Sequence, residues 1–224
     1  MNPPVITAYT LRYLAACERR VWLDQHGDVT ARVAPAPEYA SGGIEHEQRI
    51  VGRAFGPMTP VPVGSWPEML RVTQKLMRQG VAGIRGAAFE RVIDLPTPVC
   101  VRGRVDWLRR VSTPSRLGNW SYEPIEIKQR AALQAEDLLQ LDLYMWLVGA
   151  AQEREPEGWF WLGRDADYQP LQVIEHAYSE SRLLAVLNRV AQVMTAAEAP
   201  PIFLGKPCQI CPWHSACEQT AAVQ

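Results

Sequence analysis

Four cysteines near the two ends of the chain place the strongest constraint on its fold. Cys208, Cys211 and Cys217 follow one another closely near the C-terminus, and Cys17 lies near the N-terminus. Thiolates at this spacing fit either a tetrahedral Zn²⁺ site or an iron–sulfur cluster, and the spacing does not decide between them. If one metal centre holds all four thiolates, residues 1–26 and 200–224 meet in space. By analogy with a disulfide, closing a loop of about 190 residues is worth roughly 5 kcal/mol.

Composition places the chain among globular proteins. It has 224 residues, of which 47% are hydrophobic and 21% charged, enough for one sizeable core or two small ones. No stretch reaches 18 consecutive apolar residues, and the N-terminus lacks the charged and apolar regions of a secretion signal. Five cysteines is an odd number, which suits a reducing compartment better than a disulfide framework. We therefore expect a cytoplasmic, soluble protein without a membrane segment, and we interpret Cys100 as a small buried residue.

The formal net charge of −1 argues against coating a polyanion by bulk attraction. A nuclease would need only a local basic surface, and two arginine groups are candidates for one. The first group contains Arg102, Arg104, Arg109, Arg110 and Arg116, and the second contains Arg12, Arg19 and Arg20. An arginine run is more often a solvated face, so these groups gain meaning only beside a site.

Hydrophobic periodicity predicts an order of helices, a β-meander, a helix, two strands and a final helix. Helices are expected over residues 10–25, 44–55, 68–79, 135–151 and 180–197, and strands over 87–93, 99–111, 120–128, 158–163 and 171–176. Loops are expected over 27–43 and 56–67, where proline and glycine are frequent. The order predicts a single α/β or α+β domain over residues 1–224, with a mixed sheet flanked by helices.

Alternation along two of these strands predicts a polar site. In strand 99–111, Val105 and Trp107 fall on an apolar face with Val99 and Val101, and Asp106 falls on the other face. In strand 120–128, Glu126 and Lys128 share one face. If the two strands are neighbours, the two carboxylates and the lysine converge.

This combination suits the hydrolysis of a phosphodiester. Two carboxylates can hold a hard divalent ion such as Mg²⁺ or Mn²⁺, which activates water and neutralises charge that develops on the phosphate. Lys128 can orient the attacking water and stabilise the transition state. A Glu-x-Lys pair alone is common on an edge strand, but the order of motifs around this pair is much rarer.

Two further candidate residues lie on the helix after the strands, and one precedes them. Gln140 and Tyr144 are four residues apart and therefore share a helix face, where they could hold a nucleic-acid backbone or form a buried structural pair. His46 follows two glycines on the predicted helix 44–55 and is a candidate third ligand of the metal.

The motifs Gly-x-x-x-His, Gly-x-x-Asp, Glu-x-Lys and Gln-x-x-x-Tyr, in this order, resemble the RecB-like branch of the PD-(D/E)XK nucleases. With the split cysteines, the chain is similar to the CRISPR-associated Cas-four exonucleases and their iron–sulfur relatives. Residues 9–23 also resemble that family's opening, with Glu18 where a proline is usual. The resemblance covers nearly the whole chain and implies a restriction-endonuclease-like fold.

The resemblance also implies roles for the candidate residues. It implies that His46, Asp106, Glu126 and the carbonyl of Ile127 bind the catalytic Mn²⁺ or Mg²⁺. It implies that Lys128 completes catalysis, and that Gln140 and Tyr144 support the site. It favours a [4Fe–4S] cluster on Cys17, Cys208, Cys211 and Cys217, carried by the portion formed from residues 1–26 and 200–224.

The expected function is that of a metal-dependent DNA exonuclease. By the resemblance, such an enzyme trims single-stranded ends or overhangs of fragments before a CRISPR integrase captures them. One alternative is a standalone nuclease of the same fold in DNA repair or antiviral defence. An alternative of another class is a catalytically silent DNA-binding adaptor, against which the intact His46, Asp106, Glu126 and Lys128 argue.

Overall fold

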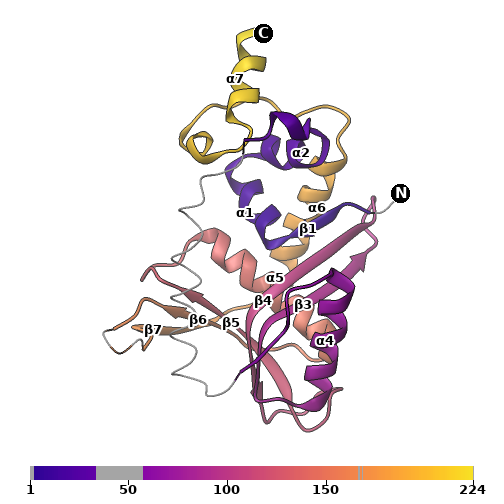
Figure 1. Cartoon of the computed structure of the whole chain (residues 1–224), viewed down its shortest axis with the longest axis vertical. Helices are drawn as coiled ribbons and strands as arrows, with labels where there is room; N and C mark the ends of the chain where they lie inside the picture. Colours follow the sequence, from indigo (N-terminus) through magenta and orange to yellow (C-terminus); the bar gives the residue numbers. More distant parts are fainter. Residues whose placement is uncertain (1–2, 34–57, 166, 168, 224) are drawn as a thin grey trace.

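The computed structural model describes residues 3–33, 58–165, 167 and 169–223. In this part of the chain, seven strands form one mixed sheet (Figure 1). Six strands follow the order β2-β3-β4-β5-β6-β7, and β1 also pairs with β4. The strands are β1 (Val5–Thr7), β2 (Thr59–Pro60), β3 (Gly83–Ile93), β4 (Val99–Val111), β5 (Ser121–Lys128), β6 (Gly158–Leu162) and β7 (Gln172–His176).

One edge of β4 is shared between two strands. Along its first half β1 runs parallel, with Thr7 opposite Arg102 at the end of the pairing. Along its second half β5 runs antiparallel, and the pairing ends where Trp107 lies opposite Ile125. Residues 103–106 of β4 therefore lie between the two pairings, where the sheet divides. This division matters because Asp106 lies at its edge.

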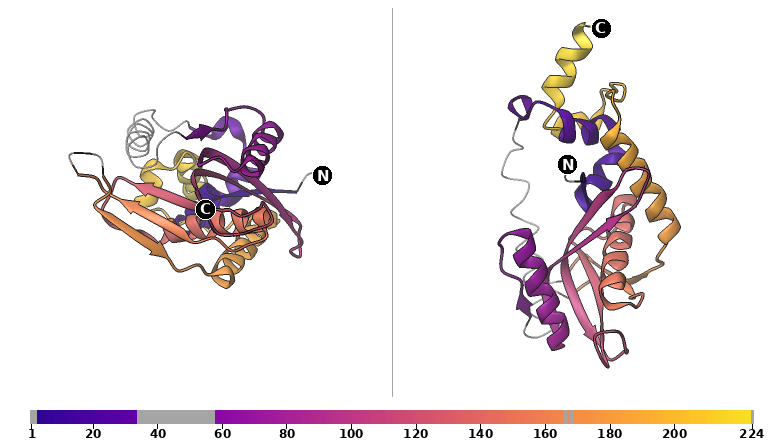
Figure 2. Two further views of the ribbon diagram at one scale, coloured as in Figure 1. Left: turned by 90° about the horizontal axis from the view of Figure 1, so that it is seen from below. Right: turned by 90° about the vertical axis from the view of Figure 1, so that its right-hand side faces the viewer.

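Helices lie on both sides of the sheet. The helices of the described residues are α1 (Ala8–Ala16), α2 (Glu18–His26), α4 (Trp66–Gln79), α5 (Ala135–Gln152), α6 (Glu180–Thr195) and α7 (His214–Val223), with short 3-10 helices η1 (Val29–Ala31) and η3 (Lys206–Ile210); α7 lies beyond the sheet at one end of the molecule (Figure 1). In the right-hand view of Figure 2, α4 lies on one side of the sheet, and α5 and α6 lie on the other. A mixed sheet flanked by helices is the predicted fold, so the fold class is confirmed.

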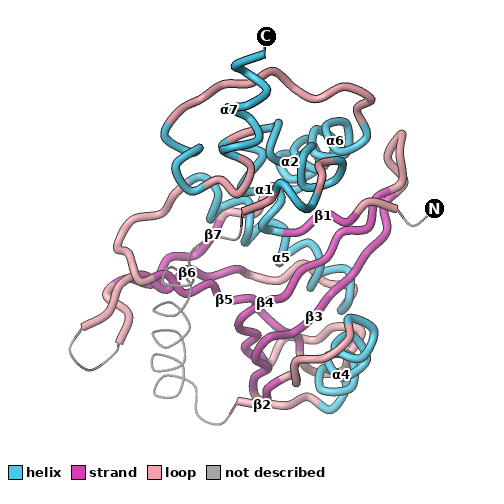
Figure 3. Tube along the Cα trace, turned by 45° about the horizontal axis from the view of Figure 1, so that its top comes forward, coloured by secondary structure: helices cyan, strands magenta, loops and turns pink. Residues whose placement is uncertain are grey.

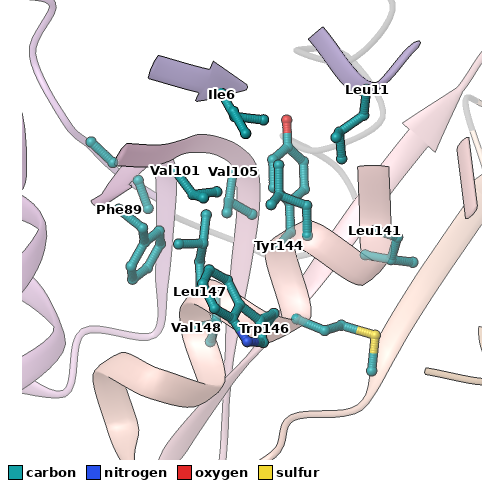
Figure 4. Packing of buried hydrophobic residues seen from close by; sticks show 14 of the residues in the cluster. Ile6, Leu11, Phe89, Val101, Val105, Leu141, Tyr144, Trp146, Leu147 and Val148 are labelled. Atoms are coloured by element: carbon teal, nitrogen blue, oxygen red, sulfur yellow. The ribbon is translucent and has the colours of Figure 1, made fainter. Parts of the chain in front are cut away.

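The main core includes residues of α1, α4 and α6, and a large part of it lies between α5 and the sheet. Figure 4 shows Val101 and Val105 of β4 packed beside Tyr144 and Leu147 of α5. A Cβ atom on Gly103 would lie 2.5 Å from Leu147 Cδ1 and 3.3 Å from Tyr144 Cδ1. The first residue of the Gly-x-x-Asp motif is thus a glycine because α5 approaches β4 too closely for a side chain.

The predicted alternation along β4 is wrong at one point. Val105 packs in the main core, whereas Trp107 belongs to a second apolar cluster with Ile125, Ile127 and Trp161. The side chains of Val105 and Trp107 therefore lie in different clusters rather than on one face of the strand. The change occurs at Asp106, and the pairing of β3 with β4 omits Asp106 and Gly86, the residue that would lie opposite it. Gly86 has a φ of +68°, which favours glycine. Local irregularity of this kind can redirect a side chain.

The helix expected over residues 10–25 is two helices. Cys17 separates α1 from α2 and has an extended backbone, with φ −168° and ψ 108°. Glu18 begins α2 and accepts two hydrogen bonds from Arg189 of α6, at 2.7 and 2.6 Å. Glu18 thus connects α2 to α6, and the break in the helix leaves Cys17 between the end of α1 and the start of α2.

Most other predicted helices and strands lie close to their observed bounds, and the structure adds short elements that were not predicted. Helix α4 ends at Gly80, whose left-handed φ of 63° closes the helix. Strands β1 and β2 were not predicted because two- and three-residue strands carry little alternation. At the C-terminal end, for which no helix was predicted, Cys208 lies on η3 and Cys217 on α7. The predicted helix 44–55 lies outside the described residues.

Candidate functional site

A hydrogen-bonded network joins the end of β5 to one face of α5. Lys128 Nζ donates to Glu126 Oε1 at 2.6 Å and to Gln140 Oε1 at 3.2 Å. Gln140 Nε2 lies 2.9 Å from Glu126 Oε1 and 3.1 Å from the hydroxyl of Tyr144. Four residues that were predicted for the site from two motifs thus lie together.

Asp106 lies beside this network. The pairing of β4 with β5 ends where Trp107 lies opposite Ile125. Asp106 precedes Trp107 and Glu126 follows Ile125, so both lie just beyond that end of the pairing. Ile125 and Ile127 both belong to the second apolar cluster, so alternation along β5 directs Glu126 toward the opposite face. Burial raises the pKa of the Asp106 carboxyl, and the positive charges of Lys128 and Arg104 oppose that shift.

Lys128 stays charged in this environment. Burial alone would lower the pKa of Lys128, but the carboxylates of Glu126 and Asp137 raise it above the usual value. The side chain of Lys128 is 17% exposed, whereas that of Glu126 is 2% exposed. A charged donor therefore reaches the surface beside a buried carboxylate, as a group that contacts a phosphate must.

Asp137 is a member of the site that the motifs did not reveal. It lies in the first turn of α5, and its side chain is 3% exposed. Its Oδ1 lies 3.5 Å from Lys128 Nζ, and its Oδ2 forms an ion pair with Arg130. The available signal was its place one turn before Gln140, which puts both residues on the same helix face.

The donor set fits a hard divalent cation. Asp106 and Glu126 supply carboxylate oxygens, and Ile127 between Glu126 and Lys128 can supply a carbonyl oxygen, which are the ligands that Mg²⁺ and Mn²⁺ prefer. The side chain of Ile127 packs in the second apolar cluster, so only its backbone is available. His46, the fourth predicted ligand, lies outside the described residues. Within the described residues, no three His, Cys, Asp or Glu side chains are grouped closely enough to enclose a metal ion.

The four predicted cysteines line one cavity of about 320 Å³. Burial raises the pKa of the Cys211 thiol and of the Cys217 thiol. Among groups near the sulfurs, the backbone of Gly205 donates to Cys208 Sγ at 3.4 Å. Residues 17 and 208–217, distant in the sequence, are thus brought to one place, and Cys100 is buried elsewhere at 5% exposure.

Contacts around this cavity hold the two ends of the chain together. Trp213, which is 2% exposed, donates to Asp24 Oδ1 at 2.8 Å. The backbone of Val33 donates to the carbonyl of Pro212 at 3.0 Å, and Arg19 donates to the carbonyl of Pro200 at 2.6 Å. Figure 3 shows α1, α2 and α7 gathered at this end of the molecule.

Most arginines of the two candidate groups have partners within the protein or line the cysteine cavity. Arg20 is 5% exposed and packs over Tyr13, and with Arg19 and Arg12 it lines the cysteine cavity. Four of the other five have internal partners: Arg102 with Glu90, Arg109 with Glu123, Arg116 with Glu153, and Arg110 with the carbonyl of Gly80. Arg104 is exposed and acts electrostatically on Asp106.

Comparison with protein families matches residues 45–218 to the PD-(D/E)XK nuclease superfamily. Because this match spans most of the chain, the protein belongs to that superfamily, whose members cleave phosphodiesters. Among solved structures, the chain is similar to one titled "Crystal structure of SSO0001", at 15% identity and a TM-score of 0.50. The alignment covers 98% of this chain and 88% of that chain. At this identity, the likeness supports the fold alone. A search of curated proteins found no match.

No helix in the described part of the chain is both long enough and apolar enough to cross a membrane.

Proposed function

We propose that the protein is a metal-dependent DNA exonuclease that trims DNA ends or overhangs. The observation that carries this proposal is the meeting of Glu126, Lys128 and Gln140 beside Asp106, where the sheet divides. Membership of a nuclease superfamily makes phosphodiester cleavage the chemistry to which such a site is suited. Arg104 is an exposed cation next to the carboxylates and can contact a phosphate of the substrate strand.

Each residue of the site has a separate task. Asp106, Glu126 and the carbonyl of Ile127, with His46, would hold Mn²⁺ or Mg²⁺. When bound, the ion supplies Lewis-acid polarisation of the phosphate and an activated water. Lys128 donates hydrogen bonds toward the phosphate and stabilises its developing negative charge. Gln140 and Tyr144 fix the positions of Glu126 and Lys128 through the hydrogen bonds described above.

We also propose that Cys17, Cys208, Cys211 and Cys217 hold a [4Fe–4S] cluster. In support, all four line one cavity, and the spacing of the cysteines suits thiolate ligation. The portion formed by residues 1–26 and 200–224 would then be closed by the cluster. The cluster has a structural role in this proposal, because the ends that it joins carry no residue of the carboxylate–lysine site.

In cells, we place this activity in the cytoplasm and in CRISPR adaptation, where a partner integrase holds the fragment whose overhang is trimmed. The resemblance in motif order and the split cysteines support this role. A standalone repair or antiviral nuclease would use the same residues, so partner dependence is the property that separates these two functions. A catalytically silent adaptor would have no use for the intact network of Glu126, Lys128 and Gln140.

The experiment that tests the proposed function uses end-labelled DNA, both single-stranded and duplex with an overhang. The protein is purified without oxygen and incubated with each DNA, with and without Mn²⁺. We expect progressive shortening from an end only with Mn²⁺, and no shortening by E126Q. Binding of both DNAs without any cleavage, at any Mn²⁺ concentration, would favour the adaptor.

A further inference from the structure

Asp137 makes two kinds of contact that can be separated experimentally. Its Oδ2 accepts a hydrogen bond at 2.8 Å from the backbone of Gln134, which caps the N-terminus of α5. The same carboxylate faces two cations, with Lys128 Nζ 3.5 Å from Oδ1 and the guanidinium of Arg130 paired with Oδ2. The first contact needs only an oxygen acceptor, whereas the second needs a negative charge.

Lys128 has two carboxylates within reach, and only one of them belongs to the expected metal ligands. Its shorter contact is to Glu126 Oε1 at 2.6 Å. If Glu126 directs its charge to a divalent ion, Lys128 loses most of the attraction that holds it there. Asp137 and Gln140 Oε1 then remain to keep the ammonium in place.

We propose that Asp137 is a positioning residue that holds the Lys128 ammonium beside the carboxylate site while Glu126 serves the metal. This inference rests on the proposed function and deepens it. Asp137 touches neither substrate nor metal and acts through Lys128. Its burial strengthens the interaction, because a pair shielded from water is screened less than an exposed one. A shift of about 1 Å in a reacting group can cost on the order of a hundredfold in rate.

The chain offers a matched control for the charge of Asp137. D137N keeps an oxygen acceptor for the backbone of Gln134 and removes the charge. R130A removes the other cation that Asp137 pairs with, and the Arg130 side chain is 36% exposed. If Asp137 were only an anchor for Arg130 and the helix end, R130A and D137N would behave alike.

The activity test measures kcat and KM for cleavage of end-labelled DNA at saturating Mn²⁺. We expect D137N to lower kcat at least about tenfold while KM for DNA stays within about twofold. R130A should keep kcat within about twofold of the unaltered protein. Equal kcat values for D137N and the unaltered protein, or equal losses in D137N and R130A, would overturn the proposal.

A second test does not depend on activity. Thermal unfolding is measured without divalent metal for the unaltered chain, D137N, K128M and the double variant. We expect the two losses in Tm to be clearly less than additive, because each variant removes the same interaction. Additive losses would overturn the proposal whatever the kinetics show. If the unaltered chain cleaves no DNA, the proposed function fails, and this cycle still decides whether Asp137 holds Lys128.

Discussion

Lys128 lies at the centre of the site because a strand and a helix each place oxygen atoms beside its ammonium group. Strand β5 places Glu126 two residues before it on the same face, and α5 places Gln140 and Asp137 one helical turn apart. The result is a lysine with three oxygen atoms within 3.5 Å. This arrangement keeps the cation in one position before substrate arrives, and such preorganisation is how charged groups stabilise a transition state.

Gly103 determines how closely α5 can approach β4, and we expect its replacement to disturb the site. In Gly103→Ala, the new Cβ would overlap Leu147 Cδ1, which is buried. Overpacking of a core typically costs about 1–3 kcal/mol. We expect a lower free energy of unfolding and lower cleavage activity, because Tyr144 lies on the displaced face. Urea unfolding and the rate of DNA cleavage check both effects.

A second variant provides the control for Gly103. Leu147→Ala added to Gly103→Ala removes the overlapping atom and should restore part of the lost activity, although the single Leu147→Ala variant is itself destabilised by about 2–5 kcal/mol. If Gly103→Ala were as active and as stable as the unaltered chain, close packing would not explain the glycine of this motif.

At the scale of elements, the break between α1 and α2 directs Cys17 toward the C-terminal segment. We expect Cys17→Ala to lose iron and sulfide together and to unfold at a lower temperature, because the chain ends would no longer be joined by the cluster. The chain-entropy analogy gives a loss of roughly 5 kcal/mol as its scale. Iron, sulfide and the absorption spectrum of anaerobically purified protein are the measurements.

Cys100→Ala is the matched control, since Cys100 is buried on β4 and does not line the cysteine cavity. It should keep the colour and the iron content. Stoichiometric zinc without sulfide in the unaltered protein would mean that the thiols hold the other metal that their spacing permits.

A comparison of the predicted and observed helices and strands shows what the local sequence pattern could predict. The sequence pattern predicted the long helices α4, α5 and α6, and it predicted the strands β3 to β7 between turn residues. Periodicity failed at Cys17, where a helical pattern continues through a residue with an extended backbone. It also failed at Trp107, whose side chain does not lie in the same cluster as that of Val105. Both failures arise from tertiary contacts, the docking of α2 on α6 and the division of the sheet at Asp106, which a local pattern does not contain.

For the candidate site, too, the sequence indicated some of the residues and not others. Glu126, Lys128, Gln140 and Tyr144, which lie in one network, could be singled out because each belongs to a short motif with a fixed spacing. Asp137 was missed because it belongs to none of these motifs, and its contact with Lys128 depends on how α5 packs against β5. The sequence also showed the number of arginines but not that Arg102, Arg109 and Arg116 are paired with carboxylates.

At the scale of the whole molecule, the charge distribution predicts modest affinity for DNA. The net charge is −1, and Arg102, Arg109 and Arg116 are already paired with carboxylates. Arginines held in ion pairs are less able to contact phosphates, so binding should be weak and should weaken further as salt rises. Fluorescence anisotropy at several salt concentrations measures this dependence. Tight binding that is insensitive to salt would show that another surface supplies the affinity.

A partner that already holds the duplex would supply the missing affinity by raising the effective concentration of the overhang. Trimming in the presence of the integrase should therefore be faster and should end at a defined length. Free DNA should be degraded without a fixed end point. Identical rates and product lengths with and without the integrase would favour a standalone nuclease.

The central claim is that Asp106 and Glu126 bind the catalytic metal and that Lys128 acts without binding it. The most direct test measures Mn²⁺ binding by calorimetry and DNA cleavage on the same preparations of D106N, E126Q and K128A. We expect all three to lose cleavage by at least about a hundredfold. Only D106N and E126Q should also lose Mn²⁺ binding, and R116A, altered in an exposed ion pair, should lose neither. Cleavage near the unaltered rate by any of the three, or loss of Mn²⁺ binding in K128A alone, would contradict the assignment.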